Sequence, residues 1–545
     1  MLSVHASDRL DPKPLVRFVT NTGYKDEPKV DQNGEIILRR TTPIHIATIF
    51  GCFEVLDDLF QIYDRFDVNY TDDDDDSVTH FHAACEYGLY DVIEKFLEFG
   101  QDPNCVWRET GDTPLLWALM RNQKEVAELL LKHGADPNLA NGDGLTPLHF
   151  ICEYGEDDYV EIFFKINEGF DRQVQLEVRD NSGNTPLLSA LKYGKKKLAE
   201  SLLRRGADPT VVNANGETPL HIVCQRLKDS DELAKMFFKV NEELNHTLQI
   251  DARDDLGNTP LHLALYNRHS KTAEVLLKRD ADPNLANAEG LTPLHIICDG
   301  YSDADGLAEF FFEINKNINR TVEIDAKDKL GRTPLELAVL RLAPETLDVL
   351  LKYGADLFSF PFPSESYFTK GLVPAASKRV IHCSYMNRLK IGSRALFMID
   401  MLENRGYKLN RGDALKIMGF FAKYRFFYEP MNLDTSWYDE EEFANKAKEI
   451  MMKPNLSLYD LVKLRPEEAE KKLAYSDYIN FVSSYKWLEL PENLRQACAA
   501  HLCETMSRGF FRRWALDSFS ELTRQTRHAR LMVFHEFSSL RAAAS

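Results

Sequence analysis

Histidine and cysteine, the residue types that most often bind metals or take part in catalysis, recur at regular places in this 545-residue chain. A histidine stands three residues after a threonine at His45, His82, His149, His221, His262 and His295. A cysteine follows four of these histidines by three residues, at Cys85, Cys152, Cys224 and Cys298. Both residue types recur at the same positions of a repeated sequence. We therefore interpret the histidines as groups that form hydrogen bonds between neighbouring repeats, and the cysteines as apolar core side chains.

Other patterns that carry chemistry are missing from the sequence. It has no phosphate-binding loop, no HExxH motif, no nucleophile elbow and no CxxC pair of metal-ligand type. The acidic run Asp72–Asp76 lacks the turn glycine and the distal glutamate of a calcium loop, so we interpret it as a solvated loop. The sequence therefore predicts a protein that is not an enzyme and that needs no cofactor or metal.

The elements that carry these residues come from one repeated phrase. Thr-Pro-Leu-His or a near copy begins at Thr42, Thr79, Thr113, Thr146, Thr185, Thr218, Thr259, Thr292 and Thr333. From Thr185 onward, spacings of 33 residues alternate with spacings of 41. A unit of this size is too small to bury a core by itself, so the units are expected to stack into a solenoid that presents a binding surface.

Each unit is predicted to contain a turn and two antiparallel helices. In the unit around Gly257, Thr259 caps the first helix and Pro260 occupies its first turn. A left-handed residue is expected to end the second helix. It is glycine in four units and Asp280 in another. The four glycines are Gly100, Gly134, Gly206 and Gly354.

The phrase, the period and the Gly-Ala-Asp-Pro endings resemble ankyrin repeats. The resemblance covers residues 38–361 as about nine repeats, preceded by a lead-in at residues 1–37, and it implies an all-α solenoid with β-turn fingers. In the longer units, apolar residues continue through Leu244 and Ile318 to Leu248 and Val322, which predicts an outer helix extended by a turn or more.

Fingers and inner helices line the concave side of such a solenoid, where a target protein would bind. We predict partner-binding residues in the fingers at Leu145, Asn184, Glu217, Leu256, Asn258, Leu291, Leu330 and Arg332. The leucines either form an exposed contact patch or pack on neighbouring fingers. The chain has a net charge of −19, and the repeats are strongly acidic whereas the C-terminal block is mildly basic, which argues against nucleic acid along the repeats. This acidity either favours a basic partner surface or serves solubility alone.

The C-terminal block, residues 362–545, follows the phenylalanine- and proline-rich segment 358–363 and is predicted to be helical. Its expected helices are Arg388–Leu402, Arg411–Tyr428, Glu440–Met451, Leu456–Val462, Pro466–Val482 and Pro491–Arg508. The helix near residues 487–508 carries an apolar ridge, Leu490, Leu494, Cys498 and Leu502, with Pro491 in its first turn. By itself this pattern is also typical of an ordinary core helix.

An ankyrin array followed by a Leu-Pro-Glu helix resembles the PRANC architecture of poxvirus and parasitoid-wasp ankyrin proteins, whose last module is similar to an F-box. The resemblance implies that Trp487, Leu490, Pro491, Leu494, Cys498 and Leu502 bind the Skp adaptor of a cullin ubiquitin ligase. Asn493 and Arg495 depart from the usual continuation of that motif. The segment Phe510–Trp514 offers an alternative, because it could fold back over the ridge.

The leading hypothesis is thus an adaptor that captures a target protein on its repeats and presents it to a ubiquitin ligase. The rival hypothesis is a non-catalytic scaffold or inhibitor that acts by occupancy alone. No membrane-length apolar run and no secretory signal occur in the sequence, so we expect a protein of the cytoplasm or the nucleus without membrane partners. The target itself is not encoded in any motif.

Overall fold

The structure is a computed structural model, and it describes residues 11–72, 78–107, 109–155, 159–300, 306–363, 385–423 and 437–525. The chain divides into two compact units, residues 1–281 and 282–545. Among the described residues of both units, helices are almost the only regular secondary structure, as the sequence predicts.

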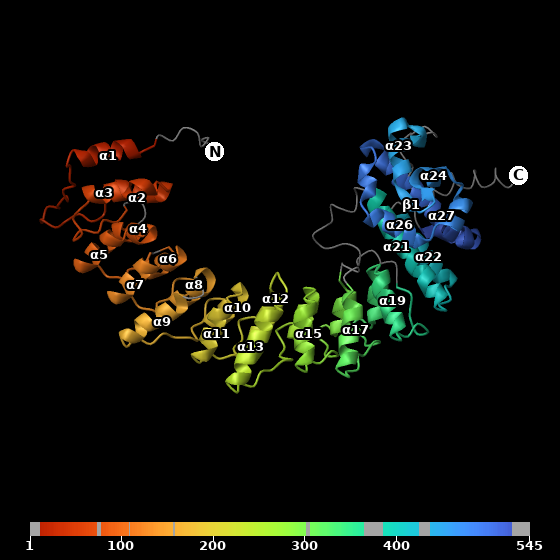
Figure 1. Cartoon of the computed structure of the whole chain (residues 1–545), viewed down its shortest axis with the longest axis horizontal. Coiled ribbons are helices and arrows are strands. Elements are labelled where there is room, and N and C mark those ends of the chain that lie inside the picture. The colour runs from red at the N-terminus through yellow and green to blue at the C-terminus, as the bar shows by residue number, and fades with distance from the viewer. Residues whose placement is uncertain are drawn as a thin grey trace. The chain divides into compact units, whose positions relative to one another are not determined.

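The first unit begins with a short helix, α1 (Lys13–Asn21), which packs on the outer helix of the first repeat. Pairs of an inner and an outer helix follow one another from there (Figure 1). The inner helices are α2 (Pro43–Phe50), α4 (His80–Tyr87), α6 (Pro114–Met120), α8 (Pro147–Tyr154), α10 (Pro186–Tyr193), α12 (Pro219–Gln225) and α14 (Pro260–Tyr266). The outer helices are α3 (Leu56–Ile62, after the 3₁₀ turn Phe53–Val55), α5 (Tyr90–Glu98), α7 (Lys124–Lys132), α9 (Tyr159–Gly169), α11 (Lys196–Arg204), α13 (Asp231–Glu243) and α15 (Ser270–Lys278).

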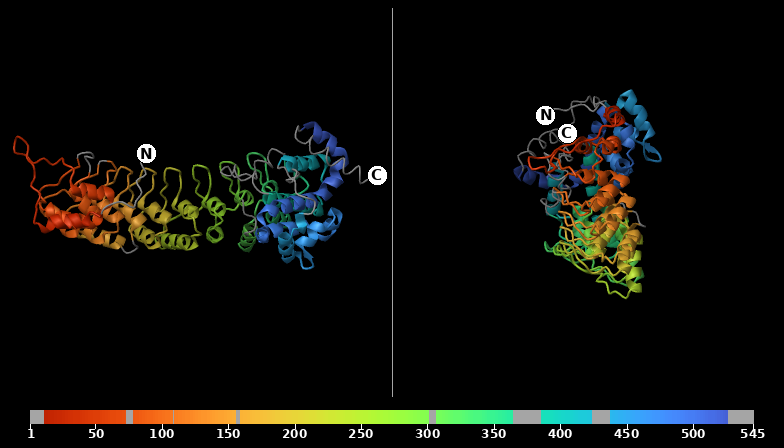
Figure 2. Two further views of the ribbon diagram at one scale, coloured as in Figure 1. Left: turned by 90° about the horizontal axis from the view of Figure 1, so that it is seen from above. Right: turned by 90° about the vertical axis from the view of Figure 1, so that its left-hand side faces the viewer.

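The loops that connect successive helix pairs project to the same side of the first unit (Figure 2, left). Each of these fingers leads into the threonine that caps the next inner helix. Thr259, for example, forms a capping box with His262, and Pro260 is the first helical residue. The predicted left-handed ends of outer helices are confirmed at Gly100, Gly134 and Gly206, and Asp280 takes this conformation at φ 70°. The repeated phrase therefore sets where each helix pair begins and ends.

The longer units differ from the prediction in their outer helices. α13 has 13 residues against nine in α11, but it ends at Glu243 and does not continue to Leu248. The chain turns at Asn245, which adopts a left-handed conformation with φ 57°. The buried Asn241 ties down the helix end, because its Nδ2 donates to the carbonyl of Phe237 and its Oδ1 lies 3.1 Å from Nδ1 of His246. The outer helix is thus longer by about one turn, as predicted. The predicted continuation of the helix to Leu248 was wrong.

The same ending recurs in the second unit. There α17 (Leu307–Asn317) does not reach Val322, and Asn319 turns the chain at φ 58°. The buried Asn315 again donates from Nδ2 to a carbonyl four residues earlier. A buried asparagine and a left-handed asparagine thus replace the Gly-Ala-Asp-Pro ending of the shorter units.

The second unit starts with two further helix pairs and continues into the terminal block. The pairs are α16 (Pro293–Cys298) with α17, and α18 (Pro334–Leu340) with α19 (Pro344–Lys352). The terminal block contains α21 (Tyr385–Asn404), α22 (Arg411–Lys423), the 3₁₀ turn Trp437–Asp439, α23 (Glu441–Glu449), β1 (Met451–Lys453), β2 (Leu456–Ser457), α24 (Leu458–Lys463), α25 (Pro466–Lys472), α26 (Tyr475–Ser483), the 3₁₀ turn Lys486–Glu489 and α27 (Glu492–Gln525).

Two expectations for the second unit are confirmed as far as the described residues extend. Gly354, the predicted left-handed residue after α19, has φ 99°. The helix expected over 411–428 is present as α22 up to Lys423, and residues 424–428 lie outside the part of the chain that the structure describes.

Two details of the terminal block depart from the sequence-based expectation. The helix expected over 466–482 is divided at Leu473 and Ala474 into α25 and α26, because the Asp477 carboxylate accepts the Ala474 N–H and starts a new helix there. In addition, β1 and β2 form a small antiparallel hairpin. Neither feature changes the helical character of the block.

The terminal block packs directly on the last helix pair, since α21 contacts α19. Arg405 pairs with Asp348 at 2.8 Å, and the guanidinium of Arg394 donates to the carbonyl of Leu342. The linker contributes Phe360 and Phe362, both buried, with the Phe360 ring 5.6 Å from that of Tyr407. The last repeat is thereby covered, as a terminal repeat requires.

Candidate protein-binding surface

The repeated histidines connect one finger to the next. In four units, the Nε2 atom lies at hydrogen-bond distance from a carbonyl of the following finger. The partners are Tyr70 for His45, Asn184 for His149, Asn258 for His221 and Arg332 for His295, at 2.9 to 3.3 Å. His82 instead lies 3.6 Å from the thiol of Cys105. The predicted link between neighbouring fingers is confirmed for His45, His149, His221 and His295.

Burial shifts the pKa values of several repeated histidines and cysteines. Removal from water lowers the pKa of His149, His221 and His295, and lowers that of His82 to about 4. The predicted core cysteines are buried, and burial raises the pKa of the Cys85 and Cys152 thiols. Neutral imidazoles and protonated thiols fit hydrogen-bonding and packing roles.

Six of the fingers are held by an asparagine or aspartate five residues before the threonine. Its Oδ1 atom accepts hydrogen bonds from the backbone N–H groups two and four residues later. These residues are Asn141, Asp180, Asn213, Asp254, Asn287 and Asp328. Their regular position in the sequence was a signal for this role that the sequence analysis missed.

Backbone hydrogen bonds also connect neighbouring finger tips. The N–H of Gly142 donates to Thr110, that of Asn181 to Asp143, and that of Ala214 to Ser182. The distances are 2.7 to 3.0 Å. The glycine two residues before the threonine leaves room for this contact, since a Cβ at Gly183 would lie 2.6 Å from the backbone nitrogen of Ala214. These fingers of the first unit therefore form a hydrogen-bonded ladder.

The eight predicted finger residues divide into two groups according to their position. Leu256 and Leu330, three residues before the threonine, are 69% and 63% exposed. The other six stand directly before the threonine, where they are buried or half-buried; they are Leu145, Asn184, Glu217, Asn258, Leu291 and Arg332. Thus the structure does not form an exposed row of four leucines.

Hydrogen bonds show why the inner position is occupied by the fold itself. Asn184 is buried, its Nδ2 donates to Asp180, and its Oδ1 accepts from Asn213. Arg332 forms a salt bridge at 2.7 Å with Asp328 of its own finger. The side chains of Asn184 and Arg332 are therefore engaged within the fingers.

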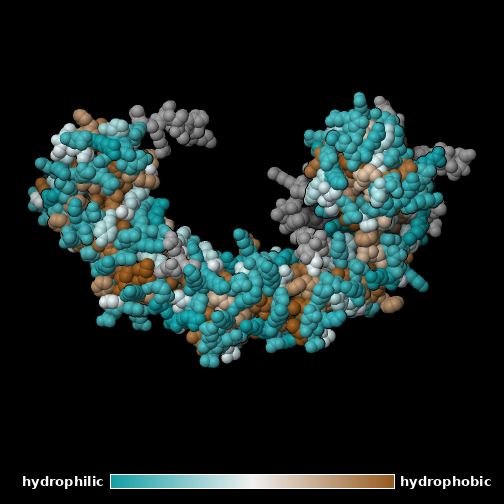
Figure 3. Space-filling view, viewed as in Figure 1, coloured by the Kyte–Doolittle hydropathy of each residue, from teal (hydrophilic) through white to brown (hydrophobic). Residues whose placement is uncertain are grey.

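The ends of the inner helices expose tyrosines that the sequence analysis missed. Tyr154, Tyr193 and Tyr266 are the last residues of α8, α10 and α14, and they are 46%, 40% and 72% exposed. Two of them stand directly before a glycine at the helix end, and this pattern in the sequence could have identified them. In the space-filling view the visible surface is mainly hydrophilic, with apolar patches between (Figure 3). Exposed aromatic rings on a polar surface are typical protein-contact residues.

A comparison with protein families identifies the repeats. Residues 44–141, 133–213 and 194–287 match the family described as ankyrin repeats. These residues are ankyrin repeats. Helices α16 to α19 continue the same alternation of inner and outer helices in the second unit.

The similar proteins are diverse in their overall function. The human transient receptor potential cation channel subfamily A member 1 is 26% identical over 52% of this chain and 28% of its own length. An ankyrin repeat protein of Acanthamoeba polyphaga mimivirus is 28% identical over 40% of this chain and 26% of its own. The mouse NF-kappa-B inhibitor delta is 28% identical over 42% of this chain and 75% of its own. The chain thus spans only about a quarter of the length of the first two relatives.

The ridge predicted to bind an adaptor lies in the interior of the terminal block. Leu490, Leu494, Cys498 and Leu502 are all at most 2% exposed. They belong to α27 or precede it directly, and α27 packs against α21, α22, α24 and α25. These apolar side chains therefore belong to the core of the block and are not an exposed surface, and the predicted binding of an adaptor stays a prediction.

The neighbours of the ridge show the same division between core and surface. Trp487 is half-buried and donates from its indole N–H to the carbonyl of Val482, and Pro491 is half-buried. Segment 510–514 does not fold back over the ridge, since α27 runs through it without a break. Tyr485 and Leu488 remain exposed beside the ridge, at 64% and 47%.

Features that would indicate a membrane span or a metal centre do not occur among the described residues. There, no helix is long and apolar enough to cross a membrane, and no three His, Cys, Asp or Glu side chains are grouped as metal ligands would be. Asp72 is buried and accepts a hydrogen bond from Thr41, while Asp73–Asp76 lie outside the part of the chain that the structure describes.

Proposed function

We propose that the ankyrin repeats capture a target protein through two exposed sets of side chains. One set is the finger tips, with Leu256 and Leu330, and the other is the row Tyr154, Tyr193 and Tyr266 at the inner-helix ends. The tyrosine row carries the proposal, because aromatic rings that stay exposed on rigid helices offer large contact area at little entropic cost. An ankyrin-repeat surface of this kind supports protein binding, and it requires no chemistry from the repeats.

A matched pair of exposed aromatic residues tests this proposal. Tyr266 lies at the end of the inner helix α14, whereas Phe99 follows the outer helix α5 and is 63% exposed. Proteins bound by the intact chain should be lost from the Tyr266→Ala variant and retained by Phe99→Ala. Equal retention by both variants would contradict capture at the inner-helix surface.

For the terminal block we propose that it recruits a Skp adaptor of a cullin ubiquitin ligase. Since the ridge is buried, recruitment would use Tyr485 and Leu488, which are exposed beside it, together with the half-buried Trp487. The rival function is a scaffold or inhibitor that works by occupancy, with the terminal block serving only to cover the last repeat. Its packing on α19 supports that rival equally.

Binding of purified Skp adaptor to the full chain distinguishes these two functions. Under the recruitment hypothesis the full chain binds, and the double variant Tyr485→Asp, Leu488→Asp abolishes binding without unfolding the block. Leu256→Asp is the matched control, because it changes another exposed leucine, in a finger of the repeats, and should leave adaptor binding intact. Absence of binding by the unaltered chain would leave the occupancy function.

A further inference from the structure

A fully exposed leucine stands in the loop between α12 and α13. Leu227 has no side-chain cover at all in the structure, with a relative exposure of 103%. The loop, residues 226–230, belongs to one of the longer units, in which the connection between the inner and outer helix is extended. Single exposed leucines are common on protein surfaces, so the meaning of Leu227 depends on how its loop is held and on the charges around it.

Hydrogen bonds to the preceding repeat fix the start of this loop. The Nη1 atom of Arg226 donates to the carbonyls of Leu191 and Lys192, at 3.0 and 2.5 Å, at the end of α10. Its Nε atom donates to Oγ of Ser230 at 2.9 Å, which closes the loop on itself. No carboxylate takes part in these contacts, and burial lowers the pKa of Arg226.

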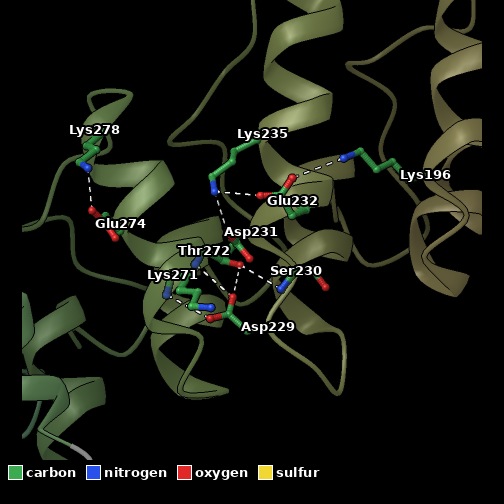
Figure 4. Close-up of polar contacts among 10 residues, drawn as sticks. All are labelled: Lys196, Asp229, Ser230, Asp231, Glu232, Lys235, Lys271, Thr272, Glu274 and Lys278. Carbon is green, nitrogen blue, oxygen red and sulfur yellow. Dashed lines mark hydrogen bonds and ion pairs between the residues drawn. The ribbon is translucent and has the colours of Figure 1, made fainter.

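Hydrogen bonds to the following repeat fix the other side of the loop. The carboxylate of Asp229 accepts the backbone N–H groups of Lys271 and Thr272, both at 3.1 Å, at the start of α15. It also accepts from Oγ1 of Thr272 at 2.6 Å. Figure 4 shows Asp229 pointing at this helix end, with Ser230 beside it. Leu227 therefore lies in a loop that hydrogen bonds connect to both the preceding and the following repeat.

Exposed lysines occur in this loop and in the two segments that hold it, although the chain as a whole is acidic. Lys192 and Lys228 are exposed, and neither forms an ion pair within the described residues. Lys196 reaches Glu232 at 3.5 Å, and the exposed Lys271 follows at the start of α15 (Figure 4). The acidic side chains nearby are already engaged, since Asp231 and Glu232 pair with Lys235.

We propose that Leu227, Lys192 and Lys228 form a second docking site, which binds an acidic protein segment that carries apolar side chains. The segment would cover Leu227 with its apolar residues and meet the two lysines with its carboxylates. Because these hydrogen bonds to both neighbouring repeats exist before binding, the loop loses little conformational entropy when the partner binds. A nucleic acid is disfavoured, because its phosphates would meet the two lysines but would leave Leu227 uncovered.

The site is separate from the finger tips. The fingers precede the inner helices, whereas the loop follows the end of α12, so the two lie at opposite ends of this helix layer. Lys192 is the neighbour of Tyr193, and the docking site thus lies next to one member of the tyrosine row. Variants at Leu256 and Tyr266 keep the two proposals distinguishable.

Fluorescence anisotropy with the full chain and a labelled short peptide of alternating glutamate and leucine tests the site. The peptide should bind, whereas polyglutamate and single-stranded DNA of equal length should bind weakly or not at all. Leu227→Asp should weaken peptide binding by about tenfold, the loss expected for one well-covered leucine. The double variant Lys192→Glu, Lys228→Glu should weaken it similarly and remove much of its salt dependence.

Leu256→Asp and Tyr266→Ala are the matched controls, and both should keep the affinity of the unaltered chain. Because Leu227 is fully exposed, its replacement should leave the thermal unfolding of the protein unchanged. The proposal is overturned if the unaltered chain does not bind the peptide, if Leu227→Asp and Leu256→Asp bind it equally, or if single-stranded DNA binds more tightly.

Discussion

The fingers of the ankyrin repeats and the ridge of α27 both present leucines in a regular pattern, yet the fold uses them in opposite ways. In the fingers, Leu256 and Leu330 remain exposed because the Asp254 and Asp328 side chains hold the loop without them. In α27, the ridge is buried, and the helix as a whole packs against four others. A regular apolar pattern therefore identifies a helix face, whereas only the surrounding elements decide whether that face is free.

The largest expected effect comes from placing a charge in the ridge. Leu494→Asp should destabilise the terminal block by about 4 kcal/mol, because it removes a core side chain and buries an unpaired carboxylate. Thermal unfolding of the full chain measures this change. Leu488→Asp is the control and should change stability by less than about 0.5 kcal/mol, since Leu488 is exposed. Equal stability of both variants would mean that the ridge is free after all.

The repeats were the predictable part of this molecule. A phrase that recurs nine times shows which residues serve the fold, and the caps at Thr259 and Thr292 and the links from His149 and His221 followed from it. The terminal block offers each pattern only once. Its helices could be predicted from apolar spacing, but the partners of α27 are far away in the sequence, so the burial of Leu494 could not.

The same limit applies within the fingers. The sequence separates repeated from variable residues, but a variable residue can still be buried. Asn184 and Leu256 both vary between repeats, yet one is 8% exposed and the other 69%. The two positions differ because the residue next to the threonine points between fingers, while the residue two places earlier lies at the tip. This distinction depends on the loop geometry set by Asp180 and Asp254.

Acid should affect the repeats through their buried histidines. Because the pKa of His82 is about 4 in the folded protein and about 6.5 in an unfolded chain, the unfolded state binds more protons between these values. Stability is therefore complete above about pH 6.5 and falls as the pH decreases toward 4, by about 2 kcal/mol at pH 5 for this residue. Urea unfolding at pH 7 and pH 5 measures the loss.

The variant His82→Gln isolates this contribution. It should be less stable than the unaltered chain at pH 7 but should lose less stability on acidification. His133→Gln provides the control for the substitution itself, because His133 is an exposed residue after α7. An unchanged pH dependence in His82→Gln would contradict the role of burial at this position.

The smallest effect is expected within a single finger, between the residue that holds it and the residue at its tip. Asp180→Ala removes an acceptor for two backbone N–H groups and should cost about 1–2 kcal/mol of stability. Asp143→Ala, at the exposed tip of the neighbouring finger, should change stability by less than about 0.5 kcal/mol, because only its backbone carbonyl takes part in the ladder. Chemical denaturation of both variants makes the comparison. If Asp143→Ala proved as costly as Asp180→Ala, the tips would be part of the framework, and target specificity would have to depend on the inner-helix tyrosines alone.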